Sequence, residues 1–225
     1  MKLITAILMS LMLFPTLSLA QNLIAWPVDE AAKDPSFLTY RNAMLEVIET
    51  QDTEALLKFV DPDIHLSFGG DVGHDAMRRS LNLSEDDLSE EYKSQATELR
   101  QAYWDELETV LRLGGRFRDR AFVAPYTWMA KTPEGADAYK TYFVTGSNVL
   151  LRNAGNADAP IITRLSYNIV YNDDWDPDAD YQAIRLPDGQ TGYLSSRYLR
   201  SQIDYRAIFS KVSGKWEMTM FIAGD

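Results

Sequence analysis

Residues 146–171 read GSNVLLRNAGNADAPIITRLSYNIVY, and residues 181–199 read YQAIRLPDGQTGYLSSRYL. In both segments, short runs rich in β-branched and aromatic residues alternate with turn-forming Asn, Asp, Gly and Pro. This alternation is typical of short strands joined by tight turns. The stretch therefore predicts a small β-barrel, which we place at residues 139–202.

The composition of the chain limits what kind of protein surrounds this stretch. The chain has 225 residues, and 46% of them are hydrophobic, which is enough for one or two packed domains. It contains no Cys, so it cannot form disulfides, and its formal net charge is −11. A surface of this charge repels phosphate backbones and anionic lipids, so we expect no nucleic-acid partner.

The first twenty residues have the composition of a secretory signal peptide. Lys2 supplies a positive charge, residues 3–13 are apolar, and Ser18 and Ala20 place small residues at a cleavage site. We expect cleavage after Ala20, and therefore a periplasmic or secreted protein. No later segment reaches the roughly 18 uncharged apolar residues of a spanning helix, so we expect no membrane span after cleavage.

Residues 21–138 are dominated by the pattern of amphipathic helices. We predict helices over four segments: 34–48, 53–60, 73–83 and 99–113. The first has Asp34 as an N-cap and Pro35 in its first turn. In the last, a stripe that includes Leu99 and Ala102 is expected to be buried. The polar segment 131–138 ends this part of the chain, so residues 21–138 predict a mainly helical domain.

The end of the chain has the signal of a β-hairpin. Two strand-like runs, 205–212 and 216–223, flank the turn Ser213-Gly214-Lys215. Both faces of these runs carry apolar residues, so we expect both faces to be covered. We therefore predict that the hairpin, within residues 203–225, packs back on the helical domain or on the barrel.

The β-rich stretch resembles a bacterial SH3 domain over about residues 141–201. The similarity is carried by Asn148–Arg152, Ala159–Ile162, Leu165–Asn168, Tyr181–Ile184, Asp188–Leu194 and Tyr198-Leu199. The resemblance implies a small SH3-like barrel that binds cell-wall peptide or an extended protein segment. With it, the predicted fold class is α+β: a mainly helical N-terminal domain, an SH3-like barrel and a C-terminal hairpin.

A second resemblance concerns the two ends of the chain. Residues 52–57 and 61–63 look like the opening of a nuclear transport factor 2-like fold, and FSKVSGKW at 209–216 looks like its closing strands. The helix predicted at 99–113 takes the place of the long central sheet which that fold requires. We therefore prefer the helical domain and keep this fold as an alternative.

Three groups of residues are candidates for sites of chemistry. His65 and His74 fit no metalloenzyme spacing, and a strand histidine beside a helix-start histidine explains them as well. The alternating Asp174, Asp176, Asp178 and Asp180 suit a hard cation but lack the Gly and Glu of a calcium loop. No serine lies in a Gly-x-Ser-x-Gly context. We predict no catalytic residues, metal or cofactor.

Aromatic residues surround the turns of the predicted barrel. Grooves lined by aromatic rings bind extended peptides, and an Arg there can pair with a carboxylate. The predicted ligand-binding residues are Arg152, Tyr167, Trp175, Tyr181 and Tyr193. The same rings can instead form the barrel core.

The sequence therefore favours a non-enzymatic binding protein of the periplasm or exterior. Its predicted partner is cell-wall peptide or an extended protein segment. One alternative is a structural or interaction protein with no open groove, in which the helix at 99–113 meets a partner. A wall hydrolase that uses carboxylates or histidines is a further alternative.

Overall fold

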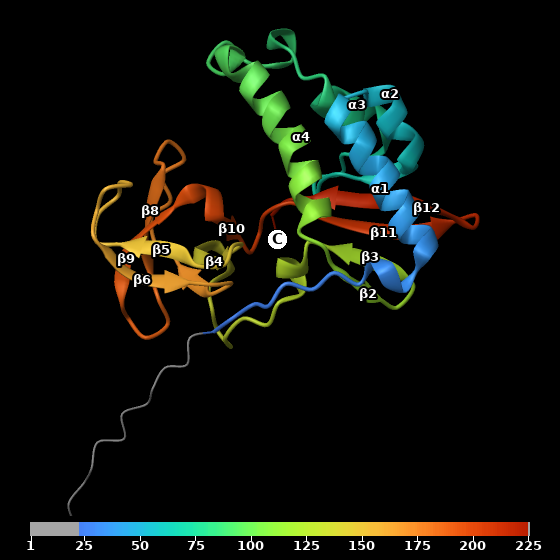
Figure 1. Cartoon of the computed structure of the whole chain (residues 1–225). Coiled ribbons are helices and arrows are strands. Elements are labelled where there is room, and N and C mark those ends of the chain that lie inside the picture. Colours follow the sequence, from blue (N-terminus) through green and yellow to red (C-terminus); the bar gives the residue numbers. More distant parts are fainter. Residues whose placement is uncertain (1–22, 225) are drawn as a thin grey trace, which may run out of the picture.

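A computed structural model describes residues 23–224, and the predicted signal peptide lies outside these residues. The described chain forms two lobes joined by a junction, and each lobe is built on one β-sheet (Figure 1). The α-helices are α1 (Pro35–Thr50), α2 (Thr53–Leu56), α3 (Gly73–Leu81) and α4 (Ala96–Arg112). The strands are β1 (Val60–His65), β2 (Arg116–Arg118), β3 (Ala121–Ala124), β4 (Thr141–Val144), β5 (Val149–Arg152), β6 (Ile161–Leu165), β7 (Ile169–Tyr171), β8 (Tyr181–Arg185), β9 (Thr191–Ser195), β10 (Leu199–Ser201), β11 (Arg206–Val212) and β12 (Lys215–Ile222).

The first lobe holds the four helices and a five-stranded sheet of order β1-β12-β11-β3-β2. β1 is parallel to β12, and the other neighbours are antiparallel. Phe209 and Phe221 of the hairpin are fully buried in one core with Phe37 of α1 and Leu107 of α4. The opposite hairpin face, which includes Ile208, is only half-buried. The helices thus cover one face of this sheet closely.

The prediction of a mainly helical N-terminal domain is therefore wrong. Within residues 23–224, the protein is mainly β, with twelve strands in two sheets and four short α-helices. β1, β2 and β3 are only 6, 3 and 4 residues long, so each carries little periodic signal. β1 pairs with β12, β3 pairs with β11, and β2 pairs with β3. The strands β11 and β12 come from the far end of the chain.

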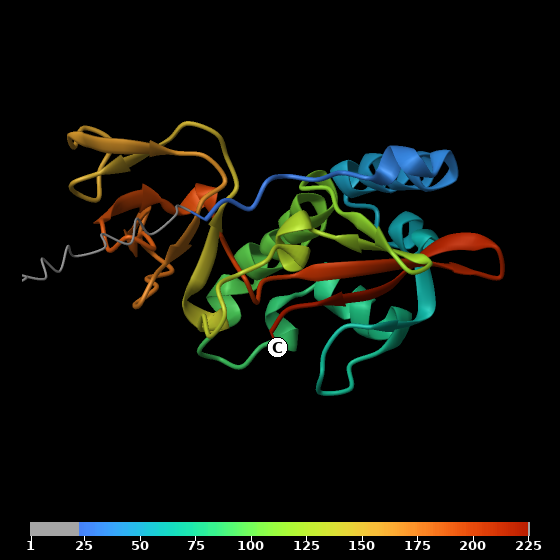
Figure 2. The ribbon, with the colours of Figure 1, turned by 90° about the horizontal axis from the view of Figure 1, so that it is seen from below.

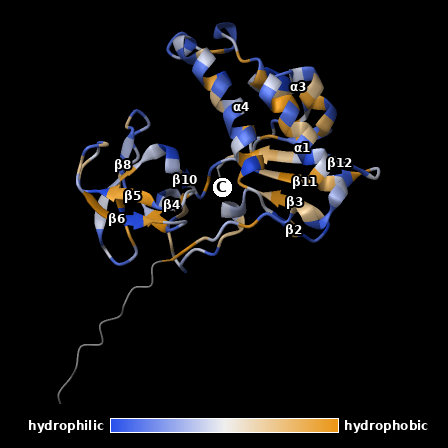
Figure 3. Cartoon of the chain, in the orientation of Figure 1, coloured by the Kyte–Doolittle hydropathy of each residue, from blue (hydrophilic) through white to orange (hydrophobic). Residues whose placement is uncertain are grey.

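The helices themselves follow their local signals. Asp34 caps α1 by accepting hydrogen bonds from the backbone nitrogens of Ser36 (2.9 Å) and Phe37 (3.2 Å), as predicted. Figure 3 shows α1, α3 and α4 with mixed polar and apolar faces, as the amphipathic pattern predicts. The buried stripe of α4 differs from the prediction, because Leu99 is 42% exposed and Trp104 is buried instead.

The second lobe is a seven-stranded antiparallel sheet of order β10-β4-β7-β8-β9-β5-β6. Its core lies between the curved strands and includes Val149, Leu151, Ile184 and Leu194. Figure 2 shows this lobe beside the first, with β4 next to the junction.

The closed barrel that the sequence predicts does not form. β10 and β6 are the two edges of the seven-stranded sheet, and no pairing joins them in the described chain. The reason lies in β4, whose four residues are all buried and which takes β10 as its edge partner. Because Phe143 of β4 packs in the core at the junction, β4 and its partner β10 are held there.

The junction has a small core of its own, made by Ala25, Tyr126, Phe143 and Ile169. The segment from residue 23 to 30 runs across both lobes (Figure 1). At one end, the backbone nitrogen of Ala25 donates to the carbonyl oxygen of Tyr167 at 2.8 Å. At the other end, Glu30 N donates to Gly115 O at 2.9 Å. The lobes are therefore connected by packing as well as by the chain.

Candidate binding surface

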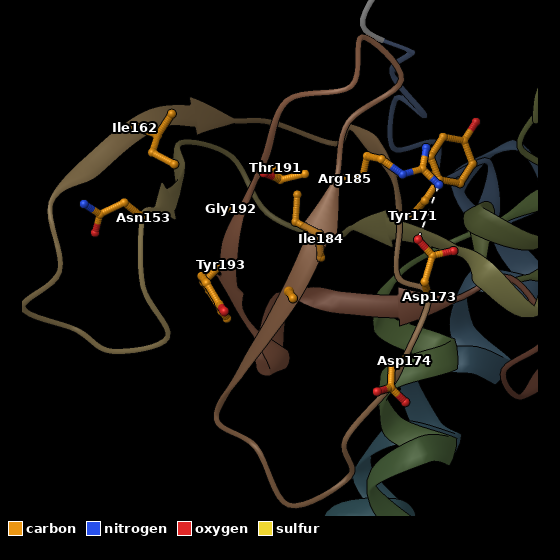
Figure 4. A pocket seen from close by; sticks show the side chains of 11 residues that line it. Asn153, Ile162, Tyr171, Asp173, Asp174, Ile184, Arg185, Thr191, Gly192 and Tyr193 are labelled. Carbon is orange, nitrogen blue, oxygen red and sulfur yellow. Dashed lines mark ion pairs between the residues drawn. The ribbon is translucent and has the colours of Figure 1, made fainter.

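A hollow of about 520 Å³ opens on the outer face of the seven-stranded sheet (Figure 4). Its walls come from strands β6 to β9 and the loops beside them, so no short segment of sequence encodes it. The lining residues are Asn153, Ile162, Tyr171, Asp173, Asp174, Ala183, Ile184, Arg185, Thr191, Gly192 and Tyr193. Most of the exposed lining is apolar, and the carboxylates lie toward one end (Figure 4).

The hollow arises where small residues stand among large ones. Ala183 of β8 lies opposite Tyr193 of β9, and Arg185 lies opposite Thr191. Residues directly opposite across antiparallel strands point to the same face, and here all four are on the exposed face. The short side chains of Ala183 and Thr191 leave a floor between taller neighbours.

Gly192 allows the strands beneath this floor to approach closely. A Cβ atom at this position would lie 2.8 Å from the carbonyl oxygen of Arg152 and 2.8 Å from Cγ of Leu151. Both distances are shorter than real Cβ contacts, so any side chain here would push β9 away from β5. The glycine therefore holds Tyr193 at the β5 side of the hollow.

One end of the hollow is charged. Asp173 pairs with Lys140 at 3.2 Å and with Arg185 at 3.6 Å, and the Arg185 guanidinium lies 5.1 Å from the centre of the Tyr171 ring. The hydrogen bond from Lys140 holds the pKa of Asp173 below its ordinary value, and Arg185 acts in the same direction. The neighbouring Asp174 is exposed and forms no ion pair within the described residues. This end is suited to a positively charged group.

The strand β6 adds an open edge next to the hollow. Among the strands of the described chain, β6 pairs only with β5. Its residues Ile161 and Ile162 are 49% and 38% exposed, and Ile162 lines the hollow. An edge strand with exposed apolar side chains offers both main-chain hydrogen bonds and side-chain contacts to an added strand.

The structure brings three of the five predicted binding residues together. Arg152 lies opposite Tyr193 in the sheet, and the loop at Gly155 packs against both Tyr193 and Tyr181. Arg152 does not point a free guanidinium at a ligand, because its Nη1 donates to the carbonyl oxygen of Ala159 at 2.6 Å. Of the five, Tyr193 lines the hollow itself.

The other two predicted residues lie elsewhere in this lobe. Tyr167 has a left-handed backbone (φ 57°) in the turn between β6 and β7. The centre of its ring lies 5.9 Å from the centre of the Trp26 ring. Trp175 stacks on Tyr142 with ring centres 5.0 Å apart and an angle of 4° between the planes. These two rings are occupied by intramolecular contacts.

The set of predicted binding residues lacks Ile162, Tyr171 and Ala183, which line the hollow. Each is an ordinary strand residue, and only the cross-strand arrangement gives it a place beside the hollow. The alternation of β8, in which Ala183 and Arg185 are exposed and Ile184 is buried, is the one local signal that could have suggested an outward face.

The histidines and carboxylates that the sequence offers for other chemistry do not form a common site in the described residues. His74 Nε2 lies 2.9 Å from the carbonyl oxygen of Val60, and His65 is at the exposed end of β1. Within residues 23–224, no group of three or more His, Cys, Asp or Glu is arranged to hold a metal ion. In the same range, every helix is too short or too polar to cross a membrane.

Comparisons of the chain with protein-family models, with curated proteins and with solved structures found no match.

Proposed function

We propose that this chain is a non-enzymatic binding protein that holds an extended peptide segment on its seven-stranded lobe. The single observation that carries the proposal is the hollow of about 520 Å³ beside the open edge of β6. The lobe offers an apolar floor, a free strand edge and a charged end within one surface. An extended segment can use all three, because its side chains alternate while its main chain remains available.

The contacts define the chemistry of the ligand. An apolar side chain fits between Ile162 and Tyr193, above the floor formed by Ala183. The main chain of the segment would add to β6 as a further strand. The exposed Asp174 favours a lysine-like or amino group at the other end, because opposite charges attract most where part of the surface is shielded from water. Cell-wall peptides and extended protein segments both offer this chemistry.

The proposal also assigns the protein to the periplasm or the exterior of the cell. This part rests on the composition of the first twenty residues, which has the charged, apolar and small-residue regions of a signal peptide. N-terminal sequencing of the protein recovered from its native cell fractions would test it, with cleavage after Ala20 as the expected result.

The binding experiment has two arms, one for each source of ligand. Retention of the purified protein on insoluble peptidoglycan tests the cell wall, and fluorescence anisotropy against a panel of labelled extended peptides tests protein segments. Ile162→Asp should weaken binding by about tenfold or more, since a charge would replace an apolar contact worth about 1.4 kcal/mol. Leu99→Asp is the matched control, because Leu99 is 42% exposed against 38% for Ile162 but lies on α4 in the other lobe.

Three results would refute the proposal. The first is no retention and no anisotropy change in either arm. The second is equal loss of binding in Ile162→Asp and Leu99→Asp, which would point to nonspecific hydrophobic contact. The third is release of soluble wall fragments by the wild-type protein, which would indicate a hydrolase.

A further inference from the structure

A second hollow, of about 680 Å³, lies in the five-stranded lobe and plays no part in the peptide-binding proposal. It is formed where the β2–β3 turn and the β11–β12 hairpin approach the start of α1, and all three of these elements lie in the five-stranded lobe (Figure 1). The lining residues are Lys33, Asp34, Phe117, Asp119, Arg120, Ala121, Ser210, Lys211 and Trp216. We call it the cationic cleft because of its three basic side chains.

The floor of the cationic cleft is apolar and held in place. The residue Trp216 is 9% exposed, and its Nε1 donates to Oγ of Ser36 at 3.0 Å. Phe117 is half-buried and packs edge-on against Phe122, with ring centres 5.1 Å apart. Ala121 adds a small side chain beside them. These three side chains give the cleft an apolar floor.

The lining of the cationic cleft has three basic side chains and two acidic ones, Asp34 and Asp119. Lys33 pairs with Glu30 at 2.7 Å, and Lys211 pairs with Asp34 at 3.1 Å. Arg120 is exposed, and it forms no ion pair or side-chain hydrogen bond with any residue that the structure describes. Its charge is therefore available to a ligand.

The strand beside the cleft carries two further arginines, on the face of β2 opposite Phe117. These are Arg116 and Arg118, and both are exposed next to the turn that carries Arg120. The whole chain has 33 acidic and 22 basic side chains, so a local group of three arginines within five residues departs from the general charge. Long polyanions would still be repelled by the net charge of −11, whereas a small anion meets only the local field.

We propose that the cationic cleft binds a small organic anion, with its apolar body against Phe117 and Trp216 and its carboxylate facing Arg120 and Lys211. The volume is within the roughly 300–1,000 Å³ that is usual for small-molecule sites. An apolar floor with a few charged groups at the rim is also the usual composition of such sites. The site is independent of peptide binding on the other lobe.

The test uses 2-naphthoate as the anionic probe and 2-naphthalenemethanol as its neutral counterpart of nearly the same shape. Isothermal titration or ligand-observed NMR with the purified protein gives both affinities. We expect 2-naphthoate to bind at least about fivefold more tightly, and added salt to reduce the difference, because exposed charge pairs are modest in strength and screened by ions. Equal affinities for the two probes, or no binding of 2-naphthoate at millimolar concentration, would overturn the proposal.

Two variants locate the site. Arg120→Glu reverses a charge that has no partner in the described chain, so it should leave stability unchanged and weaken 2-naphthoate binding by about fivefold to tenfold. Lys211→Met keeps an apolar stem over Trp216, where the Lys211 nitrogen lies 4.8 Å from the ring centre, and removes the charge. It should also weaken binding. Lys131→Glu, at an exposed position outside the cleft, is the control, and an equal effect of this variant would place the anion elsewhere.

Discussion

Arg200 of β10 donates from Nη1 to the Glu106 carboxylate of α4 at 3.1 Å, across the junction between the two lobes. Nη2 of the same guanidinium donates to the carbonyl oxygen of Tyr205 at 2.6 Å. The Arg200 side chain is 5% exposed and that of Glu106 is 28% exposed, so this pair is largely shielded from solvent. It connects the edge of one sheet to the main helix of the other lobe.

Removing the cation from this pair should destabilise the protein in a pH-dependent way. We expect Arg200→Met to lower the free energy of unfolding by about 3 kcal/mol at pH 7, because it leaves a shielded carboxylate without its partner. Burial already raises the pKa of Glu106 above its ordinary value, and Arg200 opposes this rise. Without Arg200, the pKa of Glu106 should rise further.

The sign of the pH effect follows from proton binding. A carboxyl whose pKa is higher in the folded state binds protons more strongly there, so the free energy of unfolding falls as pH rises through that range. The loss caused by Arg200→Met should therefore be larger at pH 7 than at pH 5, as urea unfolding at the two pH values can measure. An equal loss of unfolding free energy at pH 5 and at pH 7 would show that the ionisation of Glu106 does not cause the loss. Arg200→Met combined with Glu106→Gln should remove most of the difference, and the remainder would come from Asp204, whose carboxylate lies 3.7 Å from the Arg200 guanidinium.

Gly192 should tolerate no side chain. We expect Gly192→Ala to lower the free energy of unfolding by about 2 kcal/mol, because the added Cβ meets the Arg152 carbonyl oxygen and Leu151. Urea unfolding measures the change. Gly69→Ala is the matched control, since its added Cβ would meet only Oγ of Ser67 at 3.6 Å. Similar effects of the two substitutions would mean that close strand approach at Gly192 is unimportant.

Phe143 should be central to the junction. Its side chain is 1% exposed and packs with Tyr126 and Ile169. Phe143→Ala should lower the free energy of unfolding by about 3–5 kcal/mol, because it removes a buried ring and leaves a cavity. Thermal unfolding measures this loss of stability. Limited proteolysis should show faster cleavage between the lobes. Leu99→Ala, which truncates a side chain 42% exposed, should change little.

Filling the hollow on the seven-stranded lobe should block peptide binding without affecting the fold. Ala183 is exposed on β8, so Ala183→Phe places a ring in the hollow and leaves the core untouched. We expect an unchanged unfolding midpoint and at least about a tenfold loss of peptide affinity in the anisotropy assay. Ala102→Phe, on the exposed side of α4, should leave affinity unchanged. Unaltered binding by Ala183→Phe would exclude this surface.

Part of the candidate site was predictable and part was not. The turn at Asp188-Gly189 and the strands on either side of it are local features, so the hairpin that carries Tyr193 is visible in the sequence. Its neighbours Ile162 and Tyr171 belong to strands whose place in the sheet depends on long-range pairing. Tyr167 and Trp175 are aromatic residues beside turns, a pattern that favours a groove, yet each ring contacts another ring of the protein.

The sequence by itself determined the elements whose hydrogen bonds and caps are local. α1 begins at the Asp34 N-cap, and α4 follows the periodicity of its apolar residues, because a helix bonds residues four apart. Only the tertiary structure determined which strands pair in the two sheets. The parallel pairing of β1 with β12 and the position of β4 between β10 and β7 join segments distant in the chain. Their stability comes from packing against distant parts of the fold, which no short window of sequence contains. In the second lobe, the four buried residues of β4 and its pairing with β10 belong to an open sheet where a barrel was expected.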